Sequence, residues 1–301
     1  MNNKYIVVLA GSPRGGKATW NSLIKNVLQP LNADLAICLA RESLEETHLK
    51  NVAKYIWTFE EPENWKEYYV NNFSGTNWLN YFLLGEENGM AGGIDNYSGS
   101  GSIVCALKDI IHKNYIDIIE NYDYVIYSRF DQFYTDEHPS FTGDHLWIPE
   151  GEDYFGVCDR HIIFPAKYSK TYFGICDYIN GEESIKNLPK IVNPEAVFLN
   201  YLNHSGLGRK ITRINRFNFT SALTSDSTRW RVASYKVYFY KNLMMKYPDE
   251  FLLSVKTLID KYSLIKNITV NKRLMGNYYY LIGRQKIGQI LNRIRKIKNK
   301  V

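Results

Sequence analysis

A continuous apolar run, KYIVVLA at residues 4–10, stops abruptly at Gly11 and constrains the fold more than any other part of the chain. A short apolar run that ends at glycine is typical of a buried strand. The next segment, 19–31, places apolar residues at intervals of three and four, which predicts an amphipathic helix. Apolar runs at 33–40 and 54–59 predict two more strands. This order predicts an α/β protein with a mostly parallel sheet, whose first turn lies at the ligand-binding edge.

That first turn reads GSPRGGKA and has the spacing of a phosphate-binding loop. It matches G-x-x-x-x-G-K, but Ala18 stands where Ser or Thr would hold Mg²⁺. A second interpretation is a sulfotransferase loop, because GSPRGGKATW resembles the pattern G-x-P-R-S-G-T-T-W. A third is a tight turn against which a nucleotide lies, and an ordinary turn that needs glycine is a fourth. The residues expected to border a nucleotide are Gly11, Ser12, Arg14 and Lys17.

Charged residues follow a further buried strand, within YVIYSRFD at residues 124–131. Arg129 and Asp131 should face the same edge of the sheet as the glycine turn. A carboxylate at a strand end is a suitable ligand for Mn²⁺ or Mg²⁺, and arginine can pair with phosphate through two hydrogen bonds. We therefore expect both residues to hold a nucleotide, with Asp131 as a metal ligand. The alternative is a salt bridge at a strand end.

Acidic side chains in two later segments are candidates for a general base or for acceptor binding. One segment is the polar loop 150–161, and the other is the start of a helix at NPE, where Asn193 should be the N-cap. The alternatives are that His161 is a core histidine and that the acid at the helix start merely caps it. The candidates are Asp153, Asp159, His161 and Glu195.

Cysteine usage and charge limit the cellular compartment and the binding partners that we expect for this protein. The four cysteines form no C-x-x-C pair, which argues against zinc. Three of them lie in apolar runs and are expected to be buried thiols, which favours a reducing compartment. The first residues contain too short an apolar run for a signal peptide, so we expect a cytoplasmic protein. Residues 284–300 contain seven Lys and Arg and no acid. This tail suits peripheral contact with an anionic membrane rather than with nucleic acid, or simply a solvated helix face.

Four segments together resemble a family of glycosyltransferases from bacterial surface-polysaccharide clusters and large DNA viruses, of the WavE lipopolysaccharide-synthesis type. They are the R-x-D element at 129–131, the block WIPEGEDYFGVCDRH at 147–161, NPE at 193–195, and the stretch from Thr228 to Glu250 that ends in KYPDE. The resemblance covers roughly residues 1–250. It implies a GT-A-like fold with a Rossmann-like nucleotide half, a nucleotide-sugar donor, a glycan or glycolipid acceptor, and often Mn²⁺ or Mg²⁺.

We therefore expect a catalytic domain at residues 1–235 and a helical extension with a basic tail at 236–301. The expected activity is hexosyl or pentosyl transfer in surface-polysaccharide or glycoprotein-glycan synthesis. Two alternatives stay open. One is a sulfotransferase that uses the Gly11–Thr19 loop for its donor phosphate, and the other is a nucleotide-sugar-binding module without catalysis.

Overall fold

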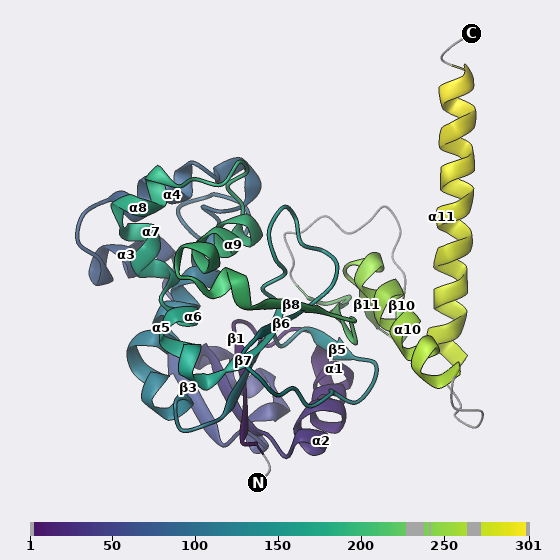
Figure 1. The fold of residues 1–301 in the computed structure, drawn as a ribbon, viewed down its shortest axis with the longest axis horizontal. Helices are drawn as coiled ribbons and strands as arrows, with labels where there is room; N and C mark the ends of the chain where they lie inside the picture. Colours follow the sequence, from purple (N-terminus) through teal and green to yellow (C-terminus); the bar gives the residue numbers. More distant parts are fainter. Residues whose placement is uncertain (1–2, 227–237, 241, 264–271, 299–301) are drawn as a thin grey trace.

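A computed structural model describes residues 3–226, 238–240, 242–263 and 272–298. Its centre is a seven-stranded sheet with the order β3-β2-β1-β4-β7-β6-β8 (Figure 1). The strands are β1 (Tyr5–Ala10), β2 (Asp34–Ala40), β3 (Tyr55–Phe59), β4 (Tyr124–Ser128), β6 (Leu146–Pro149), β7 (His161–Pro165) and β8 (Ile211–Ile214). The first four are parallel, and β7 is antiparallel to both β4 and β6. The prediction of a mostly parallel α/β sheet is therefore confirmed.

Alternate residues of the buried strands serve two separate cores. Ile6 and Val8 of β1 face one core, which is covered by α3 (Trp65–Asn72), α4 (Asn77–Leu83), α5 (Gly101–Ile119), α6 (Ser169–Phe173), α7 (Ile175–Asn180) and α9 (Pro194–His204). The short helix α8 (Glu182–Lys186) lies beside α4 and α7 (Figure 1). Val7 and Leu9 face the other core, against α1 (Gly16–Leu23) and α2 (Gln29–Leu31) (Figure 1). Burial on both faces explains why these strands are apolar throughout.

A second sheet joins the C-terminal part of the chain to the first half. Its order is β10-β11-β9-β5, with bounds β5 (Gln132–Tyr134), β9 (Asn218–Leu223), β10 (Tyr238–Tyr240) and β11 (Leu243–Met245). Phe219 and Phe239 pack here with α10 (Pro248–Ser263) and α11 (Lys272–Lys298). The segment after residue 235 is thus not only helical, as expected, because its two strands complete a sheet that earlier residues begin.

Local details of the predicted helices are partly confirmed. The helix predicted at 19–31 is α1, a π-helical turn at Ile24–Leu28 and α2. Asn193 caps α9 by accepting a hydrogen bond from the Ala196 amide at 2.8 Å, as predicted. The segment 99–122 predicts a helix that Ser100 or Ser102 could cap, and α5 is that helix. Ser100 is at its N-cap but makes no side-chain capping bond, and the hydroxyl of Ser102 donates instead to the Gly92 carbonyl.

Two expectations about the whole chain also meet the structure. All four cysteines are free and buried, one more than the three that we expected to be buried; they are Cys38, Cys105, Cys158 and Cys176. Within the described ranges, no helix is both long and apolar enough to cross a membrane. The basic tail falls in α11, which extends away from the sheets in Figure 1, and its last residues, 299–301, lie outside the described part of the chain.

Candidate functional site

The glycine-rich turn lies at the carboxyl end of β1, and its glycines are required by close packing. Gly15 has a φ of +90°, and a Cβ atom there would lie 3.0 Å from the Cα of Asp131. Gly16 has a φ of +70°, and its Cβ would lie 2.7 Å from the Leu223 side chain. The Gly15 amide donates a hydrogen bond to the Asp226 carboxylate at 3.4 Å. These contacts explain both glycines without a bound phosphate, and they bring the turn to the end of β4.

Within the R-x-D element after β4, the arginine and aspartate side chains bind each other. Arg129 donates from Nε and Nη2 to the two carboxylate oxygens of Asp131, at 3.1 and 2.5 Å. Asp131 is 4 % exposed, and its main-chain oxygen accepts a hydrogen bond from the Ser221 amide. Burial opposes ionisation of Asp131, but the positive charges of Arg129, Lys246 and Arg14 hold the pKa of this carboxyl below its usual range. Asp131 is therefore an ionised, buried group surrounded by cations.

Lys246 enters this cluster from the second sheet, directly after β11. Its amide donates to the Thr220 carbonyl at 2.9 Å, which holds the residue against β9. The residue is buried, and its burial, followed by the charge of Arg129, lowers the pKa of the Lys246 amine to about 7. The neighbouring ring of Tyr247 lies 4.9 Å from the Arg160 guanidinium carbon, within the range of a cation–π contact.

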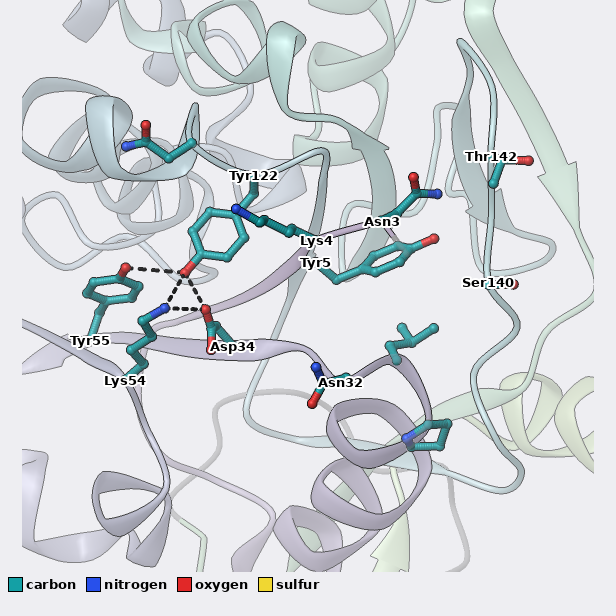
Figure 2. Close-up of a pocket in the computed structure, with 13 residues that line it drawn as sticks. Asn3, Lys4, Tyr5, Asn32, Asp34, Lys54, Tyr55, Tyr122, Ser140 and Thr142 are labelled. Atoms are coloured by element: carbon teal, nitrogen blue, oxygen red, sulfur yellow. Dashed lines mark hydrogen bonds and ion pairs between the residues drawn. The ribbon is translucent and has the colours of Figure 1, made fainter. Parts of the chain in front are cut away.

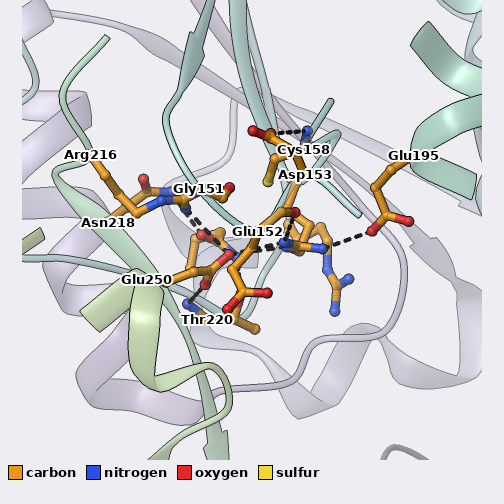
Figure 3. Close-up of polar contacts among 12 residues, drawn as sticks. Gly151, Glu152, Asp153, Cys158, Glu195, Arg216, Asn218, Thr220 and Glu250 are labelled. Carbon is orange, nitrogen blue, oxygen red and sulfur yellow. Dashed lines mark hydrogen bonds and ion pairs between the residues drawn. The ribbon is translucent and has the colours of Figure 1, made fainter. Parts of the chain in front are cut away.

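Arg160, the residue before β7, is the hub of the polar network. It donates from Nη1 to Glu195 at 3.0 Å, from Nε to Glu250 at 3.2 Å, and from Nη2 to the Glu152 carbonyl at 3.0 Å. Glu250 also accepts a hydrogen bond from the Thr220 amide. Figure 3 shows Glu195 and Glu250 on opposite sides of this network. Arg160 therefore joins the start of α9 to the start of α10 through two carboxylates.

Glu195 and Asp159 form a pair of interacting carboxyl groups. Burial raises the pKa of Glu195 to about 7, and the negative charge of Asp159 acts in the same direction. Asp159 is itself 3.4 Å from the ammonium group of Lys108, which is almost fully buried and lies 3.9 Å from the ring centre of Phe198. A carboxyl group with a pKa near neutrality can accept or release a proton at physiological pH.

The loop between β6 and β7 is fastened to the start of α9. Gly156 lies so close to this helix that a Cβ atom would be 1.9 Å from the Glu195 carbonyl oxygen. The side-chain amide of Asn193 donates to the Tyr154 carbonyl at 2.7 Å. The GEDYFG stretch and the NPE stretch are therefore parts of one structural unit that positions Glu195.

The same loop carries Asp153 and two exposed aromatic rings. Asp153 accepts a hydrogen bond from the Cys158 amide at 3.1 Å and pairs with Arg213, so it organises the loop. Tyr154 and Phe155 have φ values of +43° and +71°, which few non-glycine residues adopt. Their exposed fractions are 43 % and 77 %. Strained backbone beside exposed rings is typical of a loop retained for binding.

His161 does not join this cluster, although we expected it as a base candidate. It is completely buried, with Nδ1 3.1 Å from the Tyr134 hydroxyl and Nε2 3.3 Å from Nε2 of His138. Burial lowers the pKa of His161 well below its usual value. The structure thus places it in the core between the sheets, as the alternative interpretation of this residue stated.

The turn residues expected to border a nucleotide also differ in whether they contribute to the charge around Asp131. Gly11 donates its amide to the Cys38 carbonyl at 3.0 Å, and Ser12 is exposed. Lys17 is exposed on the first turn of α1, where its charge acts on His48. Arg14 is half-buried, and it is the turn residue whose charge acts on Asp131.

The residues at the R-x-D element do not fit a divalent cation. Both carboxylate oxygens of Asp131 already accept hydrogen bonds from Arg129. Lys246 and Arg14 add further positive charge, which would repel a cation. Among the described residues, no group of three or more His, Cys, Asp and Glu side chains is placed to hold a metal. The donor set around Asp131 thus differs from the one expected for Mn²⁺ or Mg²⁺.

A cavity of about 690 Å³ lies at the opposite edge of the sheet, beside the first residues of β1 and β2 (Figure 2). Its polar groups bond to one another: Asp34 accepts hydrogen bonds from Lys54 and from the Tyr122 hydroxyl, which also lies 3.2 Å from that of Tyr55. None of the predicted site residues lines it. Burial opposes ionisation of Asp34, but the bonds from Lys54 and Tyr122 lower its pKa, and the bond to Asp34 raises that of Lys54, so both keep their ordinary charged forms. The carboxyl and amine groups whose pKa values lie near 7, Glu195 and Lys246, are at the carboxyl edge, which makes that edge the better candidate site.

Five members of the cluster were given no role from the sequence: Lys108, Arg160, Lys246, Tyr247 and Glu250. Three of them belong to KYPDE, a segment quoted only for its resemblance. What could have drawn attention to these three residues in the sequence is that polar and charged side chains directly follow an apolar stretch that pairs with a strand. Lys108 gave a similar signal, as a cation inside the apolar face of a predicted helix.

Comparisons with known proteins add no family assignment. No protein-family model matches the chain, and no curated protein matches its sequence. The function must therefore be argued from the chemistry of the site.

Proposed function

We propose that this chain is a GT-A-type glycosyltransferase that moves a sugar from a nucleotide-sugar donor to a hydroxyl group of a glycan or glycolipid. The observation that carries the proposal is the meeting of four segments at one edge of the sheet. A cationic cluster at Arg129 and Asp131 lies beside the glycine turn. A carboxyl group of raised pKa, Glu195, is bonded to Arg160, whose charge acts on Arg129. A donor diphosphate suits the first feature, and deprotonation of an acceptor hydroxyl suits the second.

The roles follow from the contacts. The acceptor hydroxyl attacks the anomeric carbon of the donor, its proton passes to Glu195, and the bond from that carbon to the phosphate oxygen breaks. The nucleoside diphosphate leaves with one more negative charge than it had in the donor. Arg160 orients Glu195, while the exposed rings of Tyr154 and Phe155 offer flat faces to the acceptor sugar. Burial and, after it, the negative charge of Asp159 keep the pKa of Glu195 high enough for proton transfer at neutral pH.

Release of nucleoside diphosphate from a panel of nucleotide sugars, with and without simple glycosides as acceptors, tests the proposal. We expect turnover with one nucleotide class, and a loss of about 10²-fold or more in Glu195→Gln. Lys186→Ala, on an exposed helix, is the control and should keep full activity. Binding of a donor without turnover would indicate a module that lacks catalysis. Binding of adenosine 3′,5′-bisphosphate alone would favour a sulfotransferase. The proposed location is the cytoplasmic face of a membrane, with α11 near its surface.

A further inference from the structure

The cations around Asp131 outnumber its single carboxylate. Arg129 contacts both of its oxygens, and the charges of Lys246 and Arg14 act on the same group. When Lys246 is protonated, these four residues carry a net charge of +2. Nearby, Arg160 and Arg216 are balanced by Glu195 and Glu250. Two further acids lie next to the turn: Asp226 accepts a hydrogen bond from the Gly15 amide, and the charge of Arg14 also acts on Glu61. The excess of positive charge is therefore local to the carboxylate of Asp131 at the end of β4.

A nucleotide sugar presents the complementary charge, with one ionised oxygen on each of its two phosphorus atoms. Enzymes usually neutralise such a diphosphate with a divalent cation or with Arg and Lys side chains. The first way needs free carboxylate oxygens, and those of Asp131 are taken by Arg129. The second way needs several cations from separate elements. Here Arg14 comes from the turn after β1, Arg129 from the end of β4, and Lys246 from the end of β11.

We propose that Arg14, Arg129 and Lys246 bind the diphosphate of the donor directly, and that the site works without a divalent cation. This inference rests on the proposed function and names the leaving-group site. Asp131 acts as a positioning residue, because its two hydrogen bonds fix the guanidinium of Arg129. As the bond to the anomeric carbon breaks, the extra negative charge of the departing diphosphate falls among these three cations.

Lys246 gives the site a measurable signature. Burial and the positive charges of Arg129, Arg160 and Arg14 lower the pKa of this amine to about 7, and the negative charge of Asp131 acts in the opposite direction. At pH 8 the amine is mostly neutral in the free protein. A bound diphosphate favours the charged form, so binding should take up close to one proton.

Isothermal titration calorimetry with UDP, GDP, CDP and ADP tests this inference. Each probe is titrated at pH 8 in 1 mM EDTA and in 1 mM MnCl₂, in two buffers of different ionisation enthalpy. We expect one nucleoside diphosphate to bind with equal affinity in EDTA and in MnCl₂, with proton uptake. Lys246→Met should weaken binding roughly 10- to 100-fold. Lys246→Arg should keep the affinity but lose the uptake, because arginine is always charged.

Lys256→Met is the matched control, since Lys256 is an exposed lysine of α10, and it should change neither affinity nor uptake. Thermal unfolding of each variant establishes that it is folded. Binding that appears only with MnCl₂ would overturn the inference and leave the glycosyltransferase proposal standing. If the wild type and Lys246→Met bind the probe with equal affinity in EDTA, the proposed role of Lys246 is wrong. If none of the four probes binds in either condition, both proposals fail.

Discussion

Replacing Glu195 by glutamine should make the protein more stable at neutral pH while it removes activity. Glutamine has nearly the same shape as glutamate, and its oxygen can still accept the hydrogen bond from Arg160. The substitution therefore removes one buried negative charge and little else. A residue kept for catalysis at a cost in stability should show both effects together.

The magnitude follows from the pKa of Glu195, which is raised from 4.5 to about 7. Each pKa unit corresponds to about 1.4 kcal/mol, so the penalty for ionising Glu195 in the folded protein is about 3 kcal/mol. Because the folded-state pKa is raised, the stability linked to this group is complete below pH 4.5 and is lost as the pH rises through 7. Glutamine carries no such penalty at any pH.

Urea unfolding of both proteins from pH 4 to pH 8 measures this difference. At pH 4 the two free energies of unfolding should be nearly equal, and at pH 8 the variant should be more stable by about 3 kcal/mol. Glu182→Gln is the control, because Glu182 is exposed on α8, and its difference from the wild type should stay near zero. A variant that is equally or less stable at pH 8 would refute the reasoning, since Glu195 would then ionise without penalty. The transfer rate of the wild type should rise with pH through about 7 as this base loses its proton.

Three further predictions concern packing and charge. Gly156→Ala should destabilise the protein by about 3 kcal/mol in urea unfolding, because its Cβ would lie 1.9 Å from the Glu195 carbonyl oxygen. Gly276→Ala has open space around it and should stabilise α11 by about 1 kcal/mol. Equal effects of the two substitutions would contradict the close approach at Gly156. Arg160→Met should cost about 3–5 kcal/mol because it strands Glu195 and Glu250, and adding Glu195→Gln should recover part of that loss; strict additivity of the two changes would contradict the pairing. Burial lowers the pKa of His138 to about 4, so the stability that the neutral ring contributes is lost as the pH falls from 6.5 to 4. Over that range the free energy of unfolding of His138→Phe, relative to the wild type, should rise by about 3 kcal/mol. An unchanged difference between the two proteins would indicate an accessible histidine.

Most of the central sheet could be predicted because it depends on local patterns. Strands buried on both faces are apolar throughout, so β1 and β2 stand out from the helix between them. The cap at Asn193 and the glycine at Gly206, which has a φ of +79°, likewise depend on neighbours in sequence. Such features need no knowledge of distant contacts.

The rest of the site depends on pairings between distant segments. Lys246 reaches Asp131 because β11 pairs with β9, and β9 pairs with β5. His161 resembles a catalytic histidine in sequence because charged residues precede it, yet the strand that begins there turns its ring toward Tyr134. The side of a sheet that a residue faces changes with one step along the strand, so composition alone could not separate His161 from Arg160, the residue before it, whose side chain bonds to Glu195 and Glu250 instead.

The R-x-D element shows how one residue can change the chemistry of a site. In a D-x-D element two nearby carboxylates repel each other, and a divalent cation relieves that repulsion. Here the first position is Arg129, which satisfies both oxygens of Asp131 and leaves its own positive charge in place of the metal's. The expectation of a metal followed from the carboxylate alone. Arg129 is two residues before Asp131 in the sequence, a spacing that already placed it within reach of the carboxylate. Lys246, directly after β11, supplies the additional positive charge that a diphosphate needs.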